Sequence, residues 1–163
     1  MATASPKRTP AKKPSPKPRE AIALPKADHK AVAELFAACE KARAPSMKKK
    51  LVAKICTELS VHAQCEDEIF YPAVKAALKD RELVPEAIVE HATLKELISQ
   101  IEGKEPDGEM FDAKVKVLSE YVKHHVKEEQ NEMFPKAKKT KLDMRALGAQ
   151  LAARKKELLA QRS

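Results

Sequence analysis

The sequence predicts an all-α fold, and three observations support this prediction. The 163 residues include only three glycines and no tryptophan, while Ala, Leu, Lys and Glu, which favour helices, are abundant. Apolar residues recur at steps of three and four through several long segments, which is the spacing of an amphipathic helix. Alternating β-branched and aromatic runs bounded by Asn-Gly or Gly-Gly turns, which indicate strands, are absent from the sequence.

The first segment, residues 1–21, is predicted to be a disordered basic tail. Its first 20 residues contain five of the eleven prolines and almost nothing apolar to bury. Residues 1–19 carry six Lys or Arg and no acid, so they hold +6 of the formal charge of +8. We expect residues 1–20 either to make a weak electrostatic contact with nucleic acid or another acidic surface, or simply to keep the protein in solution.

The helical pattern then runs through four long segments and a C-terminal one: residues 22–43, 46–71, 84–102, 109–134 and 142–161. Pro45 ends the first segment, and Ser46 is placed to cap the second. Pro72 and Pro135 should kink or stop the second and fourth segments, while Pro85 suits the first turn of the third.

Short connections make neighbouring helices antiparallel, which defines the expected architecture. Residues 22–138 should form an up-down four-helix bundle. Residues 139–163 should add an amphipathic C-terminal helix that packs on the bundle or extends from it.

An internal repeat relates the two halves of the predicted bundle. The phrase HAQCEDEIFYP at 62–72 returns as HVKEEQNEMFP at 125–135, with His, Glu and Pro in the same register. DHKAVAELF at 28–36 likewise matches EHATLKELI at 90–98. Residues 24–72 and 86–135 therefore read as two copies of one helix pair.

The repeat places titratable side chains on the apolar stripes of all four helices. The six residues concerned are His29, His62, Glu66, His91, His125 and Glu129. In each His-x-x-x-Glu unit the two side chains lie one turn apart on one face, so both can reach one ion. An unpaired buried carboxylate is unfavourable by several kcal/mol, in a domain whose net stability is about 5–15 kcal/mol. Four imidazoles and two carboxylates therefore predict a dinuclear metal site in the core, with a set of hydrogen-bonded His–Glu pairs as the alternative.

The fourth helix offers two registers for its His–Glu pair. His124 with Glu128 is one choice, and His125 with Glu129 is the other. Both the apolar stripe and the spacing to Pro135 select the second choice. His124, rotated by about 100°, should be exposed or lie behind the ligands.

Further polar residues near the predicted site are expected to point elsewhere. Asp28 and Glu90 lie about 100° from the inward direction, so they are poor ligands and read as surface acids. Asp67 and Glu68 should face water. Cys65 flanks the stripe and reads as a small buried apolar residue, with a redox or zinc-binding role as the alternative.

The motif set DH, HxxxE…FYP, EH and HxxxE…MFP resembles that of hemerythrin-like proteins with an HHE cation-binding domain, over roughly residues 24–136. The resemblance implies a hemerythrin-like four-helix bundle that holds a non-haem di-iron centre, with the six stripe residues as ligands. Oxygen-carrying hemerythrins have five histidines, whereas here the third helix offers only His91, and Lys95 stands one turn further on. Fewer protein ligands leave positions for water or a small molecule. Tyr71 or Tyr121 could supply an oxygen ligand or simply pack with its hydroxyl bonded.

The expected cofactor is therefore a pair of iron ions. Zinc and manganese are rivals, because nitrogen and oxygen donors suit them as well. We expect a protein that binds or senses O₂, nitric oxide or peroxide at a carboxylate-bridged centre. The alternatives are a redox enzyme that acts on peroxide or ferrous iron, and a metal-stabilised scaffold that acts through its basic tail.

The sequence also indicates a location. No apolar run approaches the 18 or so residues that span a membrane, and the N-terminus lacks the apolar core of a secretory signal. The spacing of Cys39, Cys56 and Cys65 suits reduced thiols rather than a disulfide framework. A cytoplasmic protein without membrane contact is the expectation.

Overall fold

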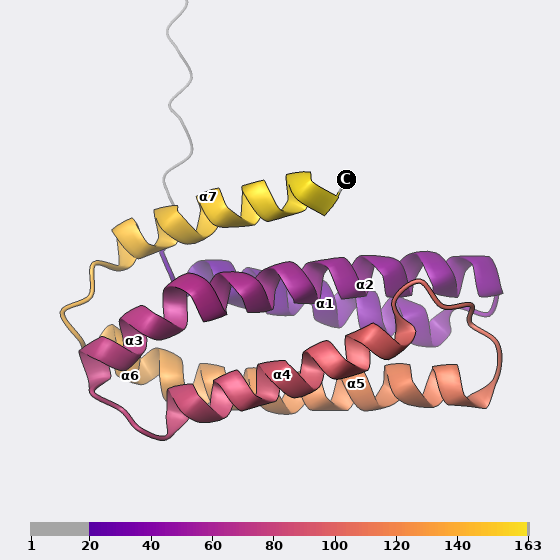
Figure 1. Cartoon of the computed structure of the whole chain (residues 1–163), viewed down its shortest axis with the longest axis horizontal. Helices are drawn as coiled ribbons and strands as arrows, with labels where there is room; N and C mark the ends of the chain where they lie inside the picture. The colour runs from indigo at the N-terminus through magenta and orange to yellow at the C-terminus, as the bar shows by residue number, and fades with distance from the viewer. Residues whose placement is uncertain (1–19, 163) are drawn as a thin grey trace, which may run out of the picture.

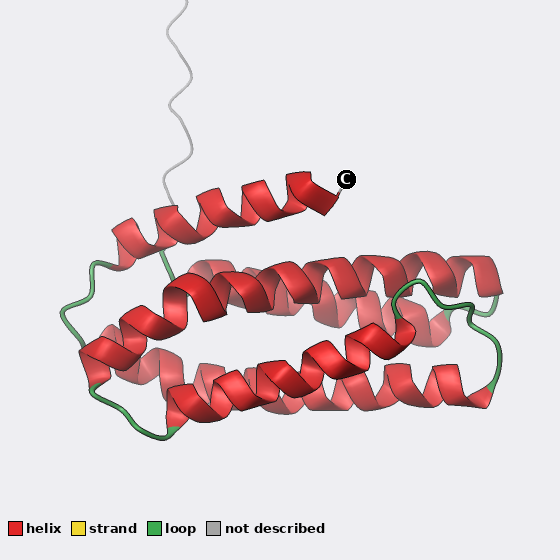
Figure 2. Ribbon diagram, viewed as in Figure 1, coloured by secondary structure: helices red, strands yellow, loops and turns green. Residues whose placement is uncertain are grey.

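The computed structural model describes residues 20–162, so residues 1–19 of the tail predicted at 1–21 lie outside the described part of the chain. This part consists of helices and the loops between them, without a strand (Figure 2). The all-α prediction is therefore confirmed. None of the helices in the described part is long and apolar enough to cross a membrane.

Four helical arms run alternately up and down the bundle (Figure 1). The helices are α1 (Ala23–Lys41), α2 (Pro45–Cys65), α3 (Tyr71–Leu78), α4 (Leu83–Ile101), α5 (Glu109–Glu128), α6 (Phe134–Lys138) and α7 (Met144–Arg162). α3 continues the arm of α2, and α6 continues the arm of α5. α1 packs mainly against α2, and α4 against α5, so each half of the internal repeat forms one antiparallel pair.

The start of α2 differs from the expected one. Pro45 occupies the first turn and Ala44 is the N-cap, without a side-chain hydrogen bond, so the prediction that Ser46 caps this helix is wrong. The reason is that proline lacks the N–H that would be unpaired there, and its fixed φ already suits a helix. The helix therefore begins one residue early, and Ser46 falls inside the first turn.

A π-helical turn interrupts each of the two long arms, at Glu66–Phe70 and at Glu129–Met133. The Tyr71 N–H donates to the Glu66 carbonyl, and the Phe134 N–H donates to the Glu129 carbonyl, five residues back in each case. A proline stands two residues after the end of each turn, at Pro72 and Pro135. Because its ring would clash with the carbonyl four residues earlier, the helix widens just before it. The two prolines thus widen the helix, and neither stops it.

The wider turn changes which residues face inward. After Glu66, the fully buried side chains of this arm are Phe70, Tyr71 and Val74, whereas Ile69, three residues after Glu66, is only partly buried. A π-helical turn contains an extra residue, so the inward face advances by one position. This shift brings Tyr71 into the core of the bundle.

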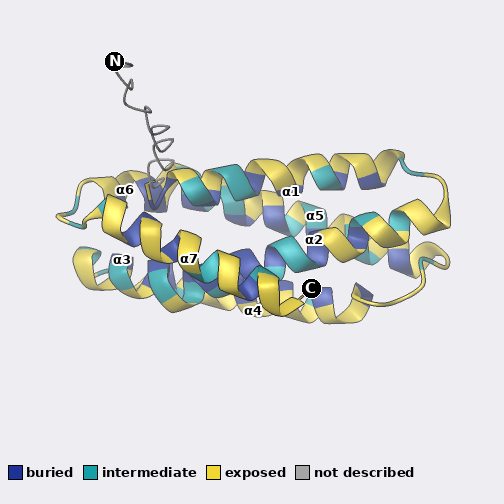
Figure 3. Ribbon diagram, turned by 90° about the horizontal axis from the view of Figure 1, so that it is seen from above, coloured by how far each residue is buried: buried dark blue, intermediate teal, exposed yellow. Residues whose placement is uncertain are grey.

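The apolar core consists of two clusters of buried residues, and the polar layer of the candidate site lies between them. Buried positions recur along the faces of the helices that look into the bundle (Figure 3). One cluster gathers around Phe70, Tyr71 and Phe134, and the other around Phe36, Ile55 and Leu118. On α4 the inward stripe passes through Ala87, while Ile88, four residues after Val84, is 45% exposed. Steps of three from Val84 and four to His91 keep Ala87 on the buried face.

The helix α7 lies over the bundle and packs against α2, against α1 and against the first π-helical turn (Figure 1). Leu147, Leu151 and Leu158 are its largest buried side chains. The Ala21 N–H donates to the Met144 carbonyl over 3.0 Å, which joins the start of the described chain to the start of α7. The C-terminal helix therefore packs on the bundle, as one of the two predicted arrangements has it.

Candidate metal centre

The six side chains singled out by the repeat meet in one layer of the bundle. Each is at most 9% exposed, and they come from α1, α2, α4, α5 and the first residue of each π-helical turn. They form two overlapping groups of four, in which the potential donor atoms lie within 4.8 Å of one another. Subsite A contains His29 and His62, subsite B contains His91 and His125, and both contain Glu66 and Glu129. Two carboxylates shared between two pairs of imidazoles offer nitrogen and oxygen donors of the kind that bind cations.

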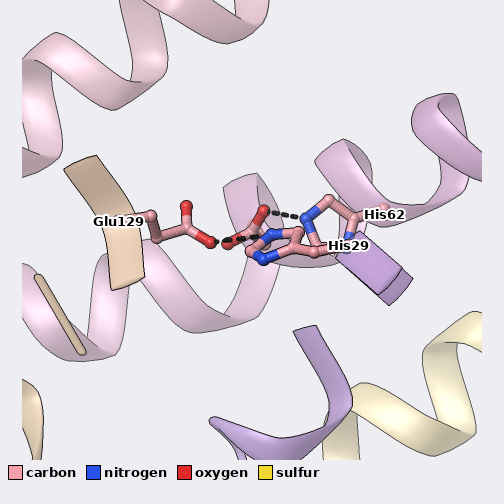
Figure 4. Close-up of side chains that lie close together, drawn as sticks. His29, His62 and Glu129 are labelled. Carbon is pink, nitrogen blue, oxygen red and sulfur yellow. Dashed lines mark ion pairs between the residues drawn. The ribbon is translucent and has the colours of Figure 1, made fainter. Parts of the chain in front are cut away.

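In subsite A the ring nitrogens face the shared carboxylates. His62 Nε2 lies 2.5 Å from Glu66 Oε1, and His29 Nε2 lies 3.3 Å from Glu129 Oε1. The two imidazole rings approach edge to face with centroids 4.9 Å apart. Figure 4 shows the His29 and His62 rings and the Glu129 carboxylate pointing toward one another.

Subsite B has the same plan on the other side of the carboxylates. His125 Nε2 lies 3.1 Å from Glu129 Oε2, and His91 Nε2 lies 3.7 Å from Glu66 Oε1. The two Nε2 atoms are 3.1 Å apart. Four Nε2 atoms thus surround two carboxylates, in a layer that the protein closes off from water.

Several donor atoms in this layer lack a hydrogen-bond partner. Five buried atoms are concerned: His29 Nε2, His62 Nε2, both carboxylate oxygens of Glu66, and Glu129 Oε1. Buried polar groups are almost always paired, because an unpaired one is unfavourable by about 1–3 kcal/mol and a charged one by more. Atoms of the type that binds cations, brought close together without hydrogen bonds, fit bound metal ions better than they fit a set of hydrogen-bonded pairs.

The Nδ1 atoms of the four histidines contact a second ring of polar residues. His62 Nδ1 lies 2.9 Å from Asp28, His91 Nδ1 lies 2.8 Å from Asp67, and His125 Nδ1 lies 3.3 Å from Glu90. A carboxylate at Nδ1 accepts its proton and leaves the Nε2 lone pair free to face the centre. Three of the four imidazoles are therefore held in the tautomer that binds a cation through Nε2.

The fourth contact is different. His29 Nδ1 lies 3.0 Å from the amide nitrogen of Gln130. When the amide is turned by 180°, its oxygen takes that place and accepts the Nδ1 proton, as the carboxylates do. His29 is thus the one histidine of the four that a neutral residue orients.

Burial acts on both shared carboxyls, with opposite results. Burial and the neighbouring Glu129 raise the pKa of Glu66 to about 8. Burial favours the neutral form of Glu129 as well, but its close contacts with His125 and His29 outweigh it and hold its pKa well below the usual range. Burial disfavours charge on His125 too, yet its hydrogen bond and attraction to Glu129 raise its pKa to about 9. Metal ions must displace these protons when they bind.

Tyr71 is a further residue at this centre. Its hydroxyl is fully buried, donates to Glu129 Oε2 over 2.6 Å, and lies 3.2 Å from the Nε2 atoms of both His91 and His125. Burial raises its pKa well above 10, so the phenol keeps its proton in the metal-free protein. The sequence suggested Tyr71 or Tyr121. Tyr121 packs against the other apolar cluster, away from the carboxylates.

Three acids lie where the sequence did not predict them. Asp28, Glu90 and Asp67 were expected at the surface, but each contacts a ring nitrogen of the candidate site, and their side chains are 14%, 14% and 23% exposed. A position 100° from the inward direction faces the neighbouring helix of the bundle rather than water. The DH and EH dipeptides of the repeat carried this signal. Glu68 is exposed, as predicted, and pairs with Arg154.

Burial decides both the register of the His–Glu pair on α5 and the character of Cys65. The side chain of His124 is 64% exposed and pairs with Glu128, whereas His125 is buried in the candidate site. Cys65 is buried, and burial raises the pKa of its thiol to about 11. Such a thiol is a poor nucleophile and a poor metal ligand at neutral pH, which fits a small apolar residue.

A small apolar cavity adjoins the centre. Its volume is about 20 Å³, and its lining includes all four histidines together with Val32, Leu59, Leu94 and Val122. It has room for about one water-sized molecule. A much larger groove of about 460 Å³ is lined by Phe36 and Phe111, which belong to the apolar cluster around Phe36, Ile55 and Leu118.

Comparison with known proteins agrees with this geometry. Residues 20–137 match the hemerythrin HHE cation-binding domain family. The chain belongs to this family. A crystal structure of an HHE cation-binding domain-containing protein from Mycobacterium kansasii has the same fold, with a TM-score of 0.74, 22% identity, and coverage of 88% of this chain and 89% of that chain.

A protein of Nostoc sp. (strain PCC 7120) named DNA nickase is 28% identical over 107 residues, which are 66% of this chain. This chain covers 30% of that protein's length. The HHE family assignment and the His/Glu clusters together identify a cation-binding domain.

Proposed function

We propose that this HHE domain holds two iron ions, one in subsite A and one in subsite B, and that it binds or senses O₂, nitric oxide or peroxide there. The observation that carries the proposal is the layer of four histidines and two glutamates in which five buried donor atoms have no hydrogen-bond partner. Iron held by these six residues would supply the redox chemistry that small oxygen- or nitrogen-containing molecules undergo at metal ions. The six ligands would be the stripe residues that the repeat marks.

The protein's own groups fit this task. The two carboxylates offset part of the charge of two cations, which explains why the fold keeps both in its core. The cavity of about 20 Å³ beside the histidines suits a diatomic or similarly small ligand, and its valine and leucine walls exclude water and larger molecules. The Tyr71 hydroxyl lies within hydrogen-bonding distance of the same layer and can donate its proton there.

Binding or sensing is favoured over turnover by the shortage of proton donors. Among the described residues outside the six proposed ligands, Tyr71 is the one proton donor whose hydroxyl lies within hydrogen-bonding distance of the Nε2 and carboxylate atoms. A redox enzyme acting on peroxide or ferrous iron is the alternative within the same site. Zinc and manganese remain rival metals, since all six donors are nitrogen or oxygen. The three free, buried cysteines support a cytoplasmic location.

The first experiment is a metal analysis of protein purified from iron-supplied cells without a chelating tag, together with its aerobic visible spectrum. Two irons per chain with ligand-to-metal charge-transfer absorption are expected. Both should be lost in Glu66→Ala and kept in the exposed-site variant Glu68→Ala. A protein with a single zinc and no visible absorption would refute the redox and gas-binding proposal.

A second candidate function rests on charge. Eight exposed Lys or Arg side chains but only four acids occur in residues 72–82 and 132–145, at the end of the bundle where α3, α6 and the start of α7 meet (Figure 1). The bases are Lys75, Lys79, Arg81, Lys136, Lys138, Lys139, Lys141 and Arg145. The bond from Ala21 to Met144 holds the start of the described chain at the same end, and the preceding residues 1–19 carry a formal charge of +6.

We propose that this basic end contacts the phosphate backbone of nucleic acid without reading its sequence. The cyanobacterial relative is a DNA nickase, but because this chain covers 30% of it, nicking itself is not carried over. Fluorescence anisotropy with a DNA duplex should show binding that weakens steeply as salt is raised. Deletion of residues 1–19 together with Lys138→Glu and Lys139→Glu should abolish it while metal content stays intact. Unchanged binding in that variant would refute this candidate.

A further inference from the structure

The helix α7 lies outside the residues 20–137 that match the family, yet it reaches the candidate metal centre through one intermediary. Lys155 Nζ donates to Asp28 Oδ1 over 2.6 Å, and Asp28 Oδ2 lies 2.9 Å from His62 Nδ1. Leu151, Ala152 and Lys155 also line a small space that His62 and Glu66 border. α7 therefore forms an outer wall of subsite A.

Subsite B contains a similar chain of contacts. Lys95 Nζ donates to Asp67 Oδ2 over 3.0 Å, and Asp67 Oδ1 lies 2.8 Å from His91 Nδ1. In the described part of the chain, neither Glu90 nor Gln130, which contact the other two histidines, bonds a lysine or arginine. Each subsite thus has one histidine in a Lys–Asp–His chain and one without a lysine.

The two chains differ in their shielding from water. The side chains of Lys155 and Asp28 are 31% and 14% exposed, whereas those of Lys95 and Asp67 are 54% and 23% exposed. Charge pairs interact more strongly where water is excluded, and salt screens them less there. Lys155 should therefore restrain its aspartate more firmly than Lys95 does.

We propose that Lys155 is a positioning residue for the metal centre. By fixing one oxygen of Asp28, it leaves the other in place to accept the His62 Nδ1 proton, and the His62 ring then presents Nε2 to the ion in subsite A. Without Lys155 the carboxylate is free to rotate, and His62 loses its fixed orientation. This inference rests on the proposed metal centre and adds that α7 helps to hold one histidine of subsite A in place.

A purely structural role for Lys155 is the competing explanation, and the neighbouring residue tests it. Arg154 also fastens α7 to the bundle, through two hydrogen bonds to Glu68 at 2.7 Å and 3.2 Å. Arg154→Met therefore weakens the docking of α7 without touching the Lys155–Asp28–His62 chain. Lys156, which is exposed on the same turn, is the control for loss of charge.

The experiment loads each metal-free protein with ferrous iron under anaerobic conditions and titrates it with a competing chromophoric chelator. In Lys155→Met one of the two ions should bind more weakly, by up to about 10-fold, the lower end of the 10–100-fold effect typical of residues that orient metal ligands. Lys155→Arg should restore binding, and Arg154→Met and Lys156→Met should match the parent. Lys95→Met should lower the affinity for one ion by less than Lys155→Met does, and this smaller effect should fade at high salt.

The outcomes separate the two proposals. If the parent protein does not hold two ions, the proposed centre fails, whatever Lys155 does. If the parent holds two and Lys155→Met retains both with unchanged affinity, the role of Lys155 is refuted. An equal loss in Arg154→Met would also refute it, because docking of α7 would then be the cause. Should Lys155→Met fail to fold, Asp28→Asn interrupts the Lys155–Asp28–His62 contacts at their middle and must lower the affinity for one ion.

Discussion

Glu66→Gln should stabilise the metal-free protein while destroying the metal centre. Glu66 is 1% exposed, and neither of its oxygens has a hydrogen-bond partner. Burial beside Glu129 raises its pKa from 4.5 to about 8. At pH 7 the unfolded chain would release this proton and the folded protein keeps it. The difference of about 2.5 pH units corresponds to about 3 kcal/mol of lost stability, which glutamine, being neutral, does not incur.

The assay is thermal and urea unfolding of metal-free protein. The change of about 3 kcal/mol predicts that the Tm of Glu66→Gln rises by roughly 6–12 °C at pH 7. Because the folded-state pKa is raised, the difference should vanish near pH 4, where both states are protonated. It should grow as pH rises and level off above pH 8. With ferrous iron added, the order should reverse, since binding stabilises only the parent.

Glu129→Gln provides the matched contrast. Glu129 occupies the equivalent position in the repeat, but it accepts a hydrogen bond from Tyr71, and its contacts with His125 and His29 hold its pKa well below the usual range. Glutamine should therefore destabilise the metal-free protein at this position, although both variants lose metal. Glu120→Gln, at an exposed site on α5, should change nothing. A metal-free Glu66→Gln that is no more stable than the parent would refute the reasoning.

Three further results are expected. His125→Ala should abolish metal binding while His124→Ala preserves it, as metal analysis of the two proteins would show. An equal loss of metal in both variants would show that the choice of His125 over His124 is wrong. Tyr71→Phe should lower the urea-unfolding free energy of the metal-free protein by about 2 kcal/mol, since it removes a hydrogen bond to a charged group. Iron affinity should rise from pH 6 to pH 9, because Glu66 and His125, with pKa values of about 8 and 9, must lose their protons when iron binds. Calorimetry in buffers of different ionisation enthalpy should detect the released protons. An affinity that does not change with pH would contradict this prediction.

The sequence predicted the helices and the meeting of the six inward side chains, because one physical signal governs both. Apolar spacing locates a helix and its buried face together, and the repeat showed which polar residues share that face. His91 and Glu129 could therefore be placed without knowing how the helices cross. Their role as metal ligands stays a prediction that the metal analysis tests.

The contacts around the site could not be predicted in this way. Asp28 and Glu90 lie 100° from the inward face, and helical spacing alone does not say whether a neighbouring helix or water lies there. Tyr71 was uncertain for another reason. Its inward orientation depends on the extra residue in the π-helical turn before Pro72, and an extrapolated α-helical period passes through Ile69 instead.

The ring of Nδ1 contacts bears on the origin of the duplicated sequence. Each helical arm orients a histidine on the next: Asp28 of α1 acts on α2, Asp67 on α4, Glu90 on α5, and Gln130 back on α1. A half-length chain with one helix pair could satisfy only the first kind of contact within itself. The second kind needs another copy, related by a twofold axis. The present chain is therefore, in its geometry, a symmetric dimer of helical hairpins joined into a single polypeptide. Because the two halves belong to one chain, equivalent positions can differ, and one Nδ1 partner is the neutral Gln130 where its counterpart is Asp67.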